Sequence, residues 1–295
     1  MKYTVLIGFT GILFQLMALM LLHDSAVAQT TGEHYRIETL QGNVFMGIIV
    51  SHNEDSVVLS TQELGEITIE RVNIRSIKNI GTGRMVDGKY WFENPQSTRY
   101  FFATNARGLK QGHWYYQNTW IFFNNVNAGV TDNISLGVGI IPLFLFGSPT
   151  TPVWLMPKVS IPIKADNLYL AAGGLFGGLI GEDSGGLGFA YGVATIGSSD
   201  KNLSVGLGYG YAGSDWSNTP FVNISGMLRV ARRTYLLTEN YFFSADHESY
   251  GLLSFGIRYA PEQLAVDFGL IRPTDEAGGL IGIPWLGITI PFGRD

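Results

Sequence analysis

The sequence predicts an all-β protein in which a small β-rich domain precedes a transmembrane antiparallel β-barrel of about twelve strands. Three observations lead to this fold class. Only 15% of the residues are charged, whereas a soluble domain usually has about a quarter. The chain also contains 38 Gly, and 13% of its residues are aromatic. From Arg99 to Phe292 the polarity alternates over segments of about ten residues that each end at a turn signal, as it does in transmembrane β-strands.

The first 28 residues have the features of a secretory signal peptide. Lys2 precedes an apolar run from Tyr3 to Leu22, and Ala26-Val27-Ala28 places small residues at the cleavage-defining positions. We therefore expect residues 1–28 to be removed during export. An uncleaved anchor is the alternative, because the apolar run is long enough to span a bilayer. The sequence has no Cys, which excludes disulfides, thiolate zinc sites and a lipidated N-terminal cysteine.

Charge and composition restrict the expected partners. The formal net charge of −5 argues against nucleic acid, which favours a basic protein surface. His34, His52 and His113 are scattered along the sequence and indicate no metal site, and we expect no cofactor. After residue 28 no segment is apolar for long enough to form a transmembrane helix. A membrane location must therefore depend on strands.

Residues 29–80 are predicted to form the small β domain, with strands at 35–40, 44–51, 56–61, 66–70 and 74–80. The pattern Ile37-x-x-Leu40-x-Gly42-x-x-x-x-Gly47-x-Ile49 and the apolar positions after it resemble those of SH3-like and Sm-like barrels. The Sm-like resemblance would imply RNA binding. Residues 34–80 are net acidic and follow an export signal, so we expect the fold without this ligand. The sequence leaves three alternatives for what this domain binds: a periplasmic protein, peptidoglycan or a second copy of itself.

Residues 81–97 are predicted to be a linker whose aromatic patch, Tyr90-Trp91-Phe92, packs on another part of the protein. Residues 98–295 are predicted to form the barrel. Its first two strands are expected at Arg99–Asn105 and Trp114–Val130. The others are expected at 134–144, 153–164, 168–180, 187–198, 203–212, 221–231, 235–243, 251–260, 264–272 and 285–292. The total is about twelve, or about ten if the first pair lies outside the membrane.

Connection lengths assign a side of the membrane to each end of the barrel. Very short turns fall at 131–133, 165–167, 199–202, 232–234 and 261–263, and longer loops such as 181–186 lie between them. Because outer-membrane barrels have short periplasmic turns, residues 29–80 are expected in the periplasm and the longer loops outside the cell. The last segment, Trp285–Phe292, resembles the aromatic-ended final strand by which such barrels are recognised for insertion, although three residues follow it.

Alternation along each strand predicts which side chains face the lumen. We expect Leu203, Val205, Leu207, Tyr209 and Tyr211 to face lipid, and likewise Leu187, Phe189, Tyr191 and Val193, so that mostly Gly and Ala line this wall of the lumen. The opposite wall is expected to carry a charge network of Arg229, Glu239, Arg258 and Asp267. Counting from the turn at 261–263 places Arg258 directly opposite Asp267, with Glu239 and Arg229 diagonal to them. Such a network either plugs the lumen or lines a conducting or ligand-holding one.

Several fragments resemble catalytic motifs. Gly83–Lys89 nearly matches a phosphate-binding loop, but Tyr90 replaces the Ser or Thr that would hold magnesium. The sequence around Ser184 resembles the nucleophile region of serine proteases but has no matching histidine segment. His247 and Ser249 resemble the His-x-Ser pair of outer-membrane phospholipases and lipid A deacylases, in which the histidine activates the serine hydroxyl. We assign no catalytic residue, and this hydrolase pair stays the alternative.

The whole layout resembles Gram-negative outer-membrane β-barrel proteins that carry an N-terminal SH3-like or Sm-like domain. The resemblance implies a non-enzymatic protein of the outer membrane, in contact with its lipids, that is either structural and interacting or a narrow pore. The class-level alternative is an outer-membrane lipid hydrolase that uses His247 and Ser249. The oligomeric state stays open.

Overall fold

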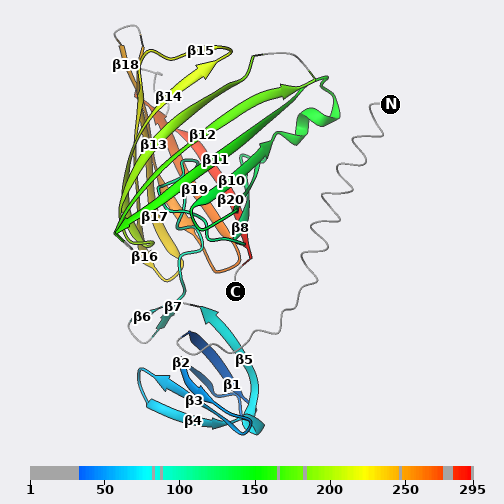
Figure 1. Ribbon diagram of the computed structural model, residues 1–295, viewed down its shortest axis with the longest axis vertical. Helices are drawn as coiled ribbons and strands as arrows, with labels where there is room; N and C mark the ends of the chain where they lie inside the picture. Colours follow the sequence, from blue (N-terminus) through cyan, green and yellow to red (C-terminus); the bar gives the residue numbers. More distant parts are fainter. Residues whose placement is uncertain are drawn as a thin grey trace. The chain divides into compact units, whose positions relative to one another are not determined.

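Strands make up both parts of the chain in the computed structural model, which describes residues 33–81, 84–86, 89–164, 167–181, 185–245, 248–274 and 282–293 (Figure 1). Contacts between residues divide the chain into two units that meet at Tyr90 and Trp91. This boundary falls inside the segment 81–97 that the sequence predicts as a linker. Residues after Tyr90 belong to the second unit, so part of the expected linker is packed with the barrel.

The first unit contains an antiparallel five-stranded sheet in the order β4-β3-β2-β1-β5. Its elements are β1 (His34–Thr39), β2 (Val44–His52), β3 (Ser56–Thr61), β4 (Gly65–Glu70), the 3₁₀ helix η1 (Arg71–Asn73) and β5 (Ile74–Gly81). A pair of short strands, β6 (Arg84–Val86) and β7 (Lys89–Trp91), follows. The five strands that the sequence predicts are confirmed to within one residue at each end. The resemblance to SH3-like and Sm-like barrels stays a prediction.

Alternating side chains build the core of this sheet. On β1, Tyr35 and Ile37 are almost fully buried, whereas Arg36 and Glu38, which alternate with them, are not. The buried core consists of Tyr35, Ile37, Ile49, Val57, Leu59 and Ile69. Ile37 and Ile49 of the sequence pattern are therefore core positions, whereas Leu40 of the same pattern is exposed.

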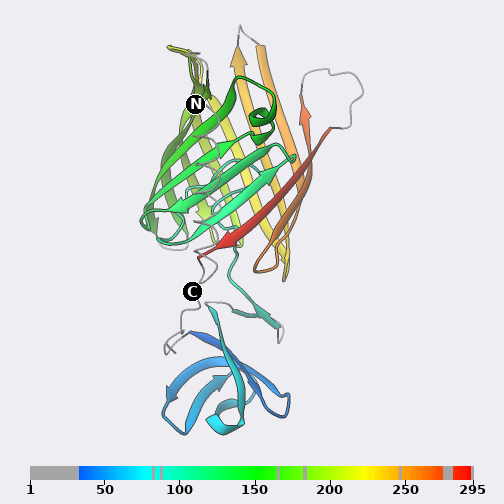
Figure 2. The same ribbon diagram turned by 90° about the vertical axis from the view of Figure 1, so that its right-hand side faces the viewer.

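The second unit is a closed antiparallel barrel of twelve strands (Figure 2). They are β8 (Trp114–Thr119), β9 (Phe123–Gly129), β10 (Ile134–Ile140), β11 (Thr151–Lys164), β12 (Leu168–Ile180), β13 (Leu187–Gly197), β14 (Lys201–Ala212), β16 (Phe221–Ala231), β17 (Thr234–Ala245), β18 (Glu248–Tyr259), β19 (Ala265–Pro273) and β20 (Ile283–Phe292). Each strand pairs with the next, and β20 pairs with β8. A closed ring leaves no unpaired strand edge, as a lipid environment requires. Two short elements, the 3₁₀ helix η2 (Pro142–Phe146) and β15 (Asp215–Trp216), lie in the connections.

The strand count is confirmed, but the first two expected strands are wrong. Arg99–Asn105 forms no strand and lies inside the ring, whereas Trp114–Val130 contains both β8 and β9. The chain reverses between them at Trp120 and Ile121, whose φ angles are 49° and 68°. Gly, Asn or Asp usually occupy such left-handed turn positions, so the sequence carries no signal for this turn. The count is right because the two errors offset each other: one expected strand is absent, and another is two strands.

Alternation predicts the face of β14 correctly. Leu203, Val205 and Leu207 are each about half exposed on the outer surface, whereas Ser204 and Gly206 are buried. Together with the aliphatic side chains of the other strands, they give the ring an apolar exterior. In the part of the chain that the structure describes, no helix is both long and apolar enough to cross a membrane.

The predicted face of β13 is wrong, because Phe189, Tyr191 and Val193 point into the lumen. They lie opposite Gly210, Gly208 and Gly206 of β14 in the register. Large side chains on one strand thus fill the space above glycines on the next. Alternation alone could not decide this face, because Gly and Ala occupy the other positions of the strand. The wall expected to be lined by small residues is therefore partly aromatic.

Two glycines on this wall should respond differently to substitution. A Cβ at Gly208 would lie 2.7 Å from the carbonyl oxygen of Ala190 and 2.4 Å from the ring of Phe221, whereas a Cβ at Gly206 meets nothing nearer than 3.4 Å. We expect Gly208→Ala to lower the free energy of unfolding by about 1–3 kcal/mol through overpacking. Gly206→Ala should leave it unchanged or raise it by up to about 1 kcal/mol. Urea titration of the refolded barrel in detergent measures both, and equal effects would contradict the packing described.

Candidate functional site in the barrel lumen

A hairpin of the chain itself occupies the lumen. We call residues 92–108 the luminal hairpin; they precede the first barrel strand and run between the strands of the ring (Figure 1). Its two arms meet in an isolated bridge between Arg99 and Thr104. The N–H of Tyr100 donates to the Ala103 carbonyl at 2.9 Å, and this bond closes the tip. Because the arms have few bonds to each other, side chains of the wall must satisfy the rest of their backbone.

The predicted pair of Arg258 and Asp267 is present and holds the first arm of the luminal hairpin. The two residues lie opposite each other in the register of β18 and β19, and Arg258 Nε donates to Asp267 Oδ1 at 2.6 Å. Arg99 donates to the other carboxylate oxygen at 2.9 Å. The three side chains are at most 1% exposed. A hairpin residue that the sequence analysis had placed on a strand thus completes the cluster.

Most of the remaining donors of this cluster go to the hairpin backbone, and Arg99 also donates to the side chains of Gln96 and Thr289. Arg258 donates to the carbonyl oxygens of Gln96 and Arg99 at 3.3 Å and also to that of Tyr100. Arg99 donates to the carbonyl oxygens of Tyr100 at 2.9 Å and Phe101 at 3.1 Å. A buried guanidinium is stable only when its donors are paired in this way. The cluster therefore connects β18 and β19 to the hairpin at several points.

Glu239 holds the tip of the luminal hairpin by a different interaction. Its carboxylate accepts the N–H groups of Phe101, Phe102 and Ala103 at 2.8, 2.9 and 3.1 Å. It also accepts the hydroxyl of Tyr241 at 2.9 Å. Charge-assisted bonds from several backbone donors are a strong way to keep a buried carboxylate. The expected diagonal charge contact of Glu239 is wrong, because its partners are backbone N–H groups and the Tyr241 hydroxyl rather than another charged side chain.

Arg229 lies near the short-turn end of the barrel and apart from Glu239. It donates to both carboxylate oxygens of Asp200 at 3.2 Å and to the carbonyl oxygen of Phe92 at 2.8 Å. Its guanidinium also lies over the ring of Trp91, 4.8 Å from the centroid. The four charges predicted as one network therefore occupy three places. The reason is distance along β16 and β17: Glu239 pairs with Ser225, four positions before Arg229.

The second arm of the luminal hairpin has its own anchors, which the sequence analysis missed. Lys158 on β11 is buried, and its ammonium donates to the carbonyl oxygens of Asn105 and Arg107 at 3.2 and 2.7 Å. The N–H of Ala106 donates to Thr195 Oγ1 at 2.8 Å. A signal for Lys158 existed, because a lysine in the middle of a transmembrane strand is expected to face the lumen. Its acceptors could not be foreseen while residues 99–105 were assigned to the wall.

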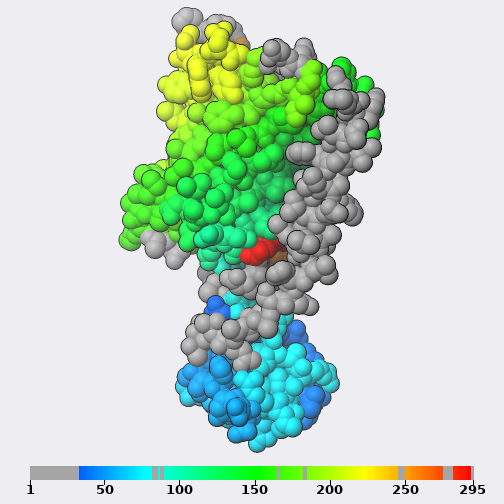
Figure 3. All heavy atoms as spheres, turned by 45° about the vertical axis from the view of Figure 1, so that its right-hand side comes forward, coloured from blue at the N-terminus to red at the C-terminus, as the bar shows by residue number. Residues whose placement is uncertain are grey.

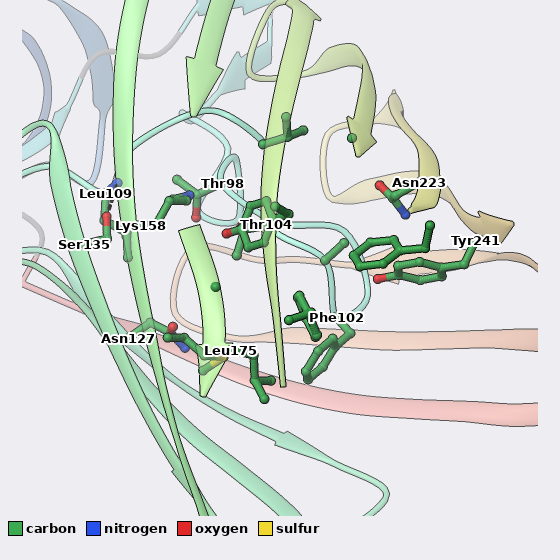
Figure 4. A pocket seen from close by; sticks show the side chains of 18 of the residues that line it. Thr98, Phe102, Thr104, Leu109, Asn127, Ser135, Lys158, Leu175, Asn223 and Tyr241 are labelled. Carbon is green, nitrogen blue, oxygen red and sulfur yellow. Dashed lines mark hydrogen bonds between the residues drawn. The ribbon is translucent and has the colours of Figure 1, made fainter. Parts of the chain in front are cut away.

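Two cavities lie beside the luminal hairpin. The larger, which we call the cup, has a volume of 580 Å³ and is lined by the hairpin tip and by β13, β16, β17, β18 and β20 among others. The smaller, which we call the crevice, has a volume of 70 Å³. In Figure 4, Thr98, Phe102 and Thr104 of the hairpin face Lys158 and Tyr241 of the wall across it. Four side chains line both cavities: Phe102, Phe189, Phe221 and Tyr241.

The motifs that resemble catalytic sites gain no support from the structure. Gly83, Ser184 and His247 lie outside the described residues. Ser249 is on β18 and pairs with Ser244, but its side chain is also outside the description. Within the described ranges no group of three or more His, Asp and Glu side chains is placed to hold a metal ion.

Comparison with known proteins finds barrels of the outer membrane. No family model and no curated protein matches the chain. Among solved structures, the NanC porin is 10% identical and covers 62% of this chain and 98% of its own, with a TM-score of 0.40. Outer-membrane expressed OmpT of Vibrio cholerae is 13% identical and covers 88% of this chain and 94% of its own, with a TM-score of 0.32. A loop L8 deletion mutant of OmpT is 12% identical and covers 88% of this chain and 96% of its own, with a TM-score of 0.33. These matches concern the fold alone.

The structure itself shows a closed ring with an apolar exterior, part of which is drawn in green and yellow in Figure 3. The chain has the fold of an outer-membrane β-barrel. Viewed from the side, the strands are tilted relative to the long axis of the barrel (Figure 2), which closing a sheet requires. The lumen of this barrel differs from an open channel, because the luminal hairpin lies inside it and is bound to the wall on several sides.

The buried ion cluster should dominate the stability of the barrel. Asp267→Ala leaves both Arg99 and Arg258 without their carboxylate, and we expect a loss of about 3–5 kcal/mol in the free energy of unfolding. Arg258→Ala should cost less, since Arg99 still pairs with Asp267. The double variant should lose clearly less free energy of unfolding than the sum of the losses in the two single variants. Urea unfolding of the four proteins measures the cycle, and additive effects would show that the residues do not interact.

Proposed function

We propose that the protein is an integral outer-membrane β-barrel with a structural or interacting role, without enzymatic activity, whose lumen is closed by its own luminal hairpin. The anchoring of the hairpin carries this proposal. One arm is bound through Asp267, the tip through Glu239, and the other arm through Lys158. Buried charged groups paired in this way are costly to separate. The lumen therefore serves as a packed core rather than a wide channel.

The proposed placement of the first unit is the periplasm. The chain enters the barrel at Trp91 and Phe92, beside Arg229 and the short turn at Asp200. Short turns are on the periplasmic side of outer-membrane barrels. Residues 34–80 precede this point, so they would emerge on the periplasmic side and be available there to a protein or to peptidoglycan. The barrel would then act as their membrane anchor.

A narrow pore is the second candidate, and the crevice is the observation that favours it. The crevice continues from the cup along the hairpin to Lys158 and Ser135. Its volume of 70 Å³ has room for a few water molecules. Phe102, Phe189, Phe221 and Tyr241 separate it from the cup. A pore along this path would be narrow and gated by these rings.

Conductance across planar bilayers separates the two candidates. We expect wild-type protein to show no steady current, and Glu239→Ala to produce frequent openings because the hairpin tip loses its acceptor. Val205→Ala on the lipid face is the control and should behave as wild type. A steady wild-type current that Phe102→Ala increases would establish the narrow pore instead. Phospholipid hydrolysis by wild-type protein, abolished by Ser249→Ala, would overturn the non-enzymatic assignment.

Location and orientation are tested on cells. The protein should sediment with outer membranes and migrate faster in SDS before heating than after it, because a closed barrel keeps its strand edges paired. Protease added to intact cells should cleave at residues 181–186 and leave residues 34–80 intact. After the outer membrane is permeabilised, an epitope placed before residue 34 should be lost as well. Cleavage within residues 34–80 on intact cells would contradict the periplasmic placement.

A further inference from the structure

The cup is an apolar chamber whose floor is the tip of the luminal hairpin. Phe101 and Phe102 form this floor. Aromatic side chains also supply much of the wall: Trp120, Phe123, Phe189, Phe221, Tyr241, Phe243 and Trp285. A volume of 580 Å³ with such a lining is typical of a pocket for a small apolar ligand. The plugging of the lumen does not require this space, which lies beyond the tip.

Among the described residues that line the cup, charge is confined to one carboxylate, which is fully hydrogen-bonded. Among its lining residues only Glu239 is ionisable as an acid or a base near neutral pH, and its carboxylate accepts three backbone N–H groups and the Tyr241 hydroxyl. These bonds occupy the carboxylate, and the described part of the lining has no other charge to pair with an ionic ligand. Hydroxyl groups of Ser217, Thr219 and Ser244 lie on the lining at the loop end. The cup is thus apolar at its floor and polar at its rim.

The barrel wall is shortest where the cup reaches β8 and β9. β8 pairs with β20 only from Gly287 onward, and the earlier residues of β20 are bound instead by Trp120. Its N–H donates to the Leu286 carbonyl at 3.0 Å, and its indole N–H to the Pro284 carbonyl at 2.7 Å. Trp120 lines the cup, whereas its neighbour Ile121 is 75% exposed. A single turn therefore separates the cup from the lipid-facing surface.

The conformation of this turn is itself unusual. Trp120 and Ile121 both have positive φ angles, of 49° and 68°. A β-branched residue such as Ile121 is strained in this conformation, and such strain often marks a functional position. Here it places one large apolar side chain toward the cup and the next toward the outside. The edge-to-face contact of Trp120 with Trp285, at 4.9 Å between centroids, fixes the first of them.

We propose that the cup binds the hydrocarbon chain of an amphipathic molecule, with the chain on the aromatic floor and an uncharged polar group at the hydroxyl rim. The aromatic lining matches an alkyl or acyl chain, and the lack of an available charge disfavours a ligand with an ionic group inside the cup. The low wall at Trp120 gives the ligand a short route from the bilayer. This site is independent of whether the barrel conducts ions.

Quenching of tryptophan fluorescence by a dibrominated long-chain fatty alcohol tests the proposal. Trp120 and Trp285 line the cup and report on a bound chain. Gly210→Leu fills the cup, because a Cβ at Gly210 lies 3.7 Å from its nearest neighbour and meets no obstacle. Gly192→Leu is the matched control on the neighbouring strand: its Cβ also has space, with the nearest atom at 4.0 Å, and the residue is exposed on the outside. Heat-dependent mobility in SDS checks that both variants are folded.

We expect saturable quenching in wild type and in Gly192→Leu, and affinity weaker by about tenfold or more in Gly210→Leu. In wild type, an unbrominated fatty alcohol should relieve the quenching and glucose should not, which tests the site even if Gly210→Leu fails to fold. Dibrominated phosphatidylcholine vesicles replace the free alcohol in a second arm. Quenching there that Gly210→Leu reduces identifies membrane lipid as the source of the chain; an effect with free alcohol alone identifies a free amphiphile. Non-saturable quenching in wild type, or equal affinity in the two glycine variants, overturns the proposal.

Discussion

The carboxylate of Asp267 is the interaction on which the lumen depends. It lies between two guanidinium groups, one from the wall and one from the luminal hairpin, and all three side chains are buried. Burying these charges is costly unless every donor finds an acceptor. Hairpin carbonyl groups from Gln96 to Phe101 supply most of the remaining acceptors, and the side chains of Gln96 and Thr289 supply the others. The wall and the hairpin therefore depend on each other. The strands bring Arg258 beside Asp267, and the hairpin carbonyl oxygens accept the guanidinium donors that the carboxylate does not.

Most of the wall could be predicted from the sequence, because strand positions follow from local signals. Alternation of polarity and short turns locate ten of the twelve barrel strands, from β10 onward. Counting residues outward from one turn was enough to place Arg258 opposite Asp267. Such arguments work because β18 and β19 are neighbours in sequence and a two-residue period fixes each face. They require no knowledge of distant parts of the chain.

The luminal hairpin and its partners could not be predicted in this way. Its segment Arg99–Asn105 contains aromatic residues of the kind that favour strands. Its partners are far away in sequence: Arg99 bonds to Asp267, and Phe101 to Glu239. The turn at Trp120 was not predicted for another reason: Trp120 and Ile121 have positive φ angles, which residues of these types rarely adopt. The prediction of the inward face of β13 was wrong because Gly and Ala on one side of a strand fit both the lumen and the lipid. In each case a tertiary contact decided what the local pattern left open.

Closing the lumen and shaping the cup are consequences of the same bonds. Glu239 fixes three successive N–H groups of the hairpin tip, and two of them belong to Phe101 and Phe102, the floor of the cup. Phe101 also packs against Trp285, at 5.5 Å between ring centroids, and Trp285 contacts Trp120 at the low part of the wall. A displacement of the tip would therefore remove the floor of the cup and the barrier to the crevice together. The position of these rings therefore depends both on the backbone N–H groups that Glu239 accepts and on the packing of Phe101 against Trp285.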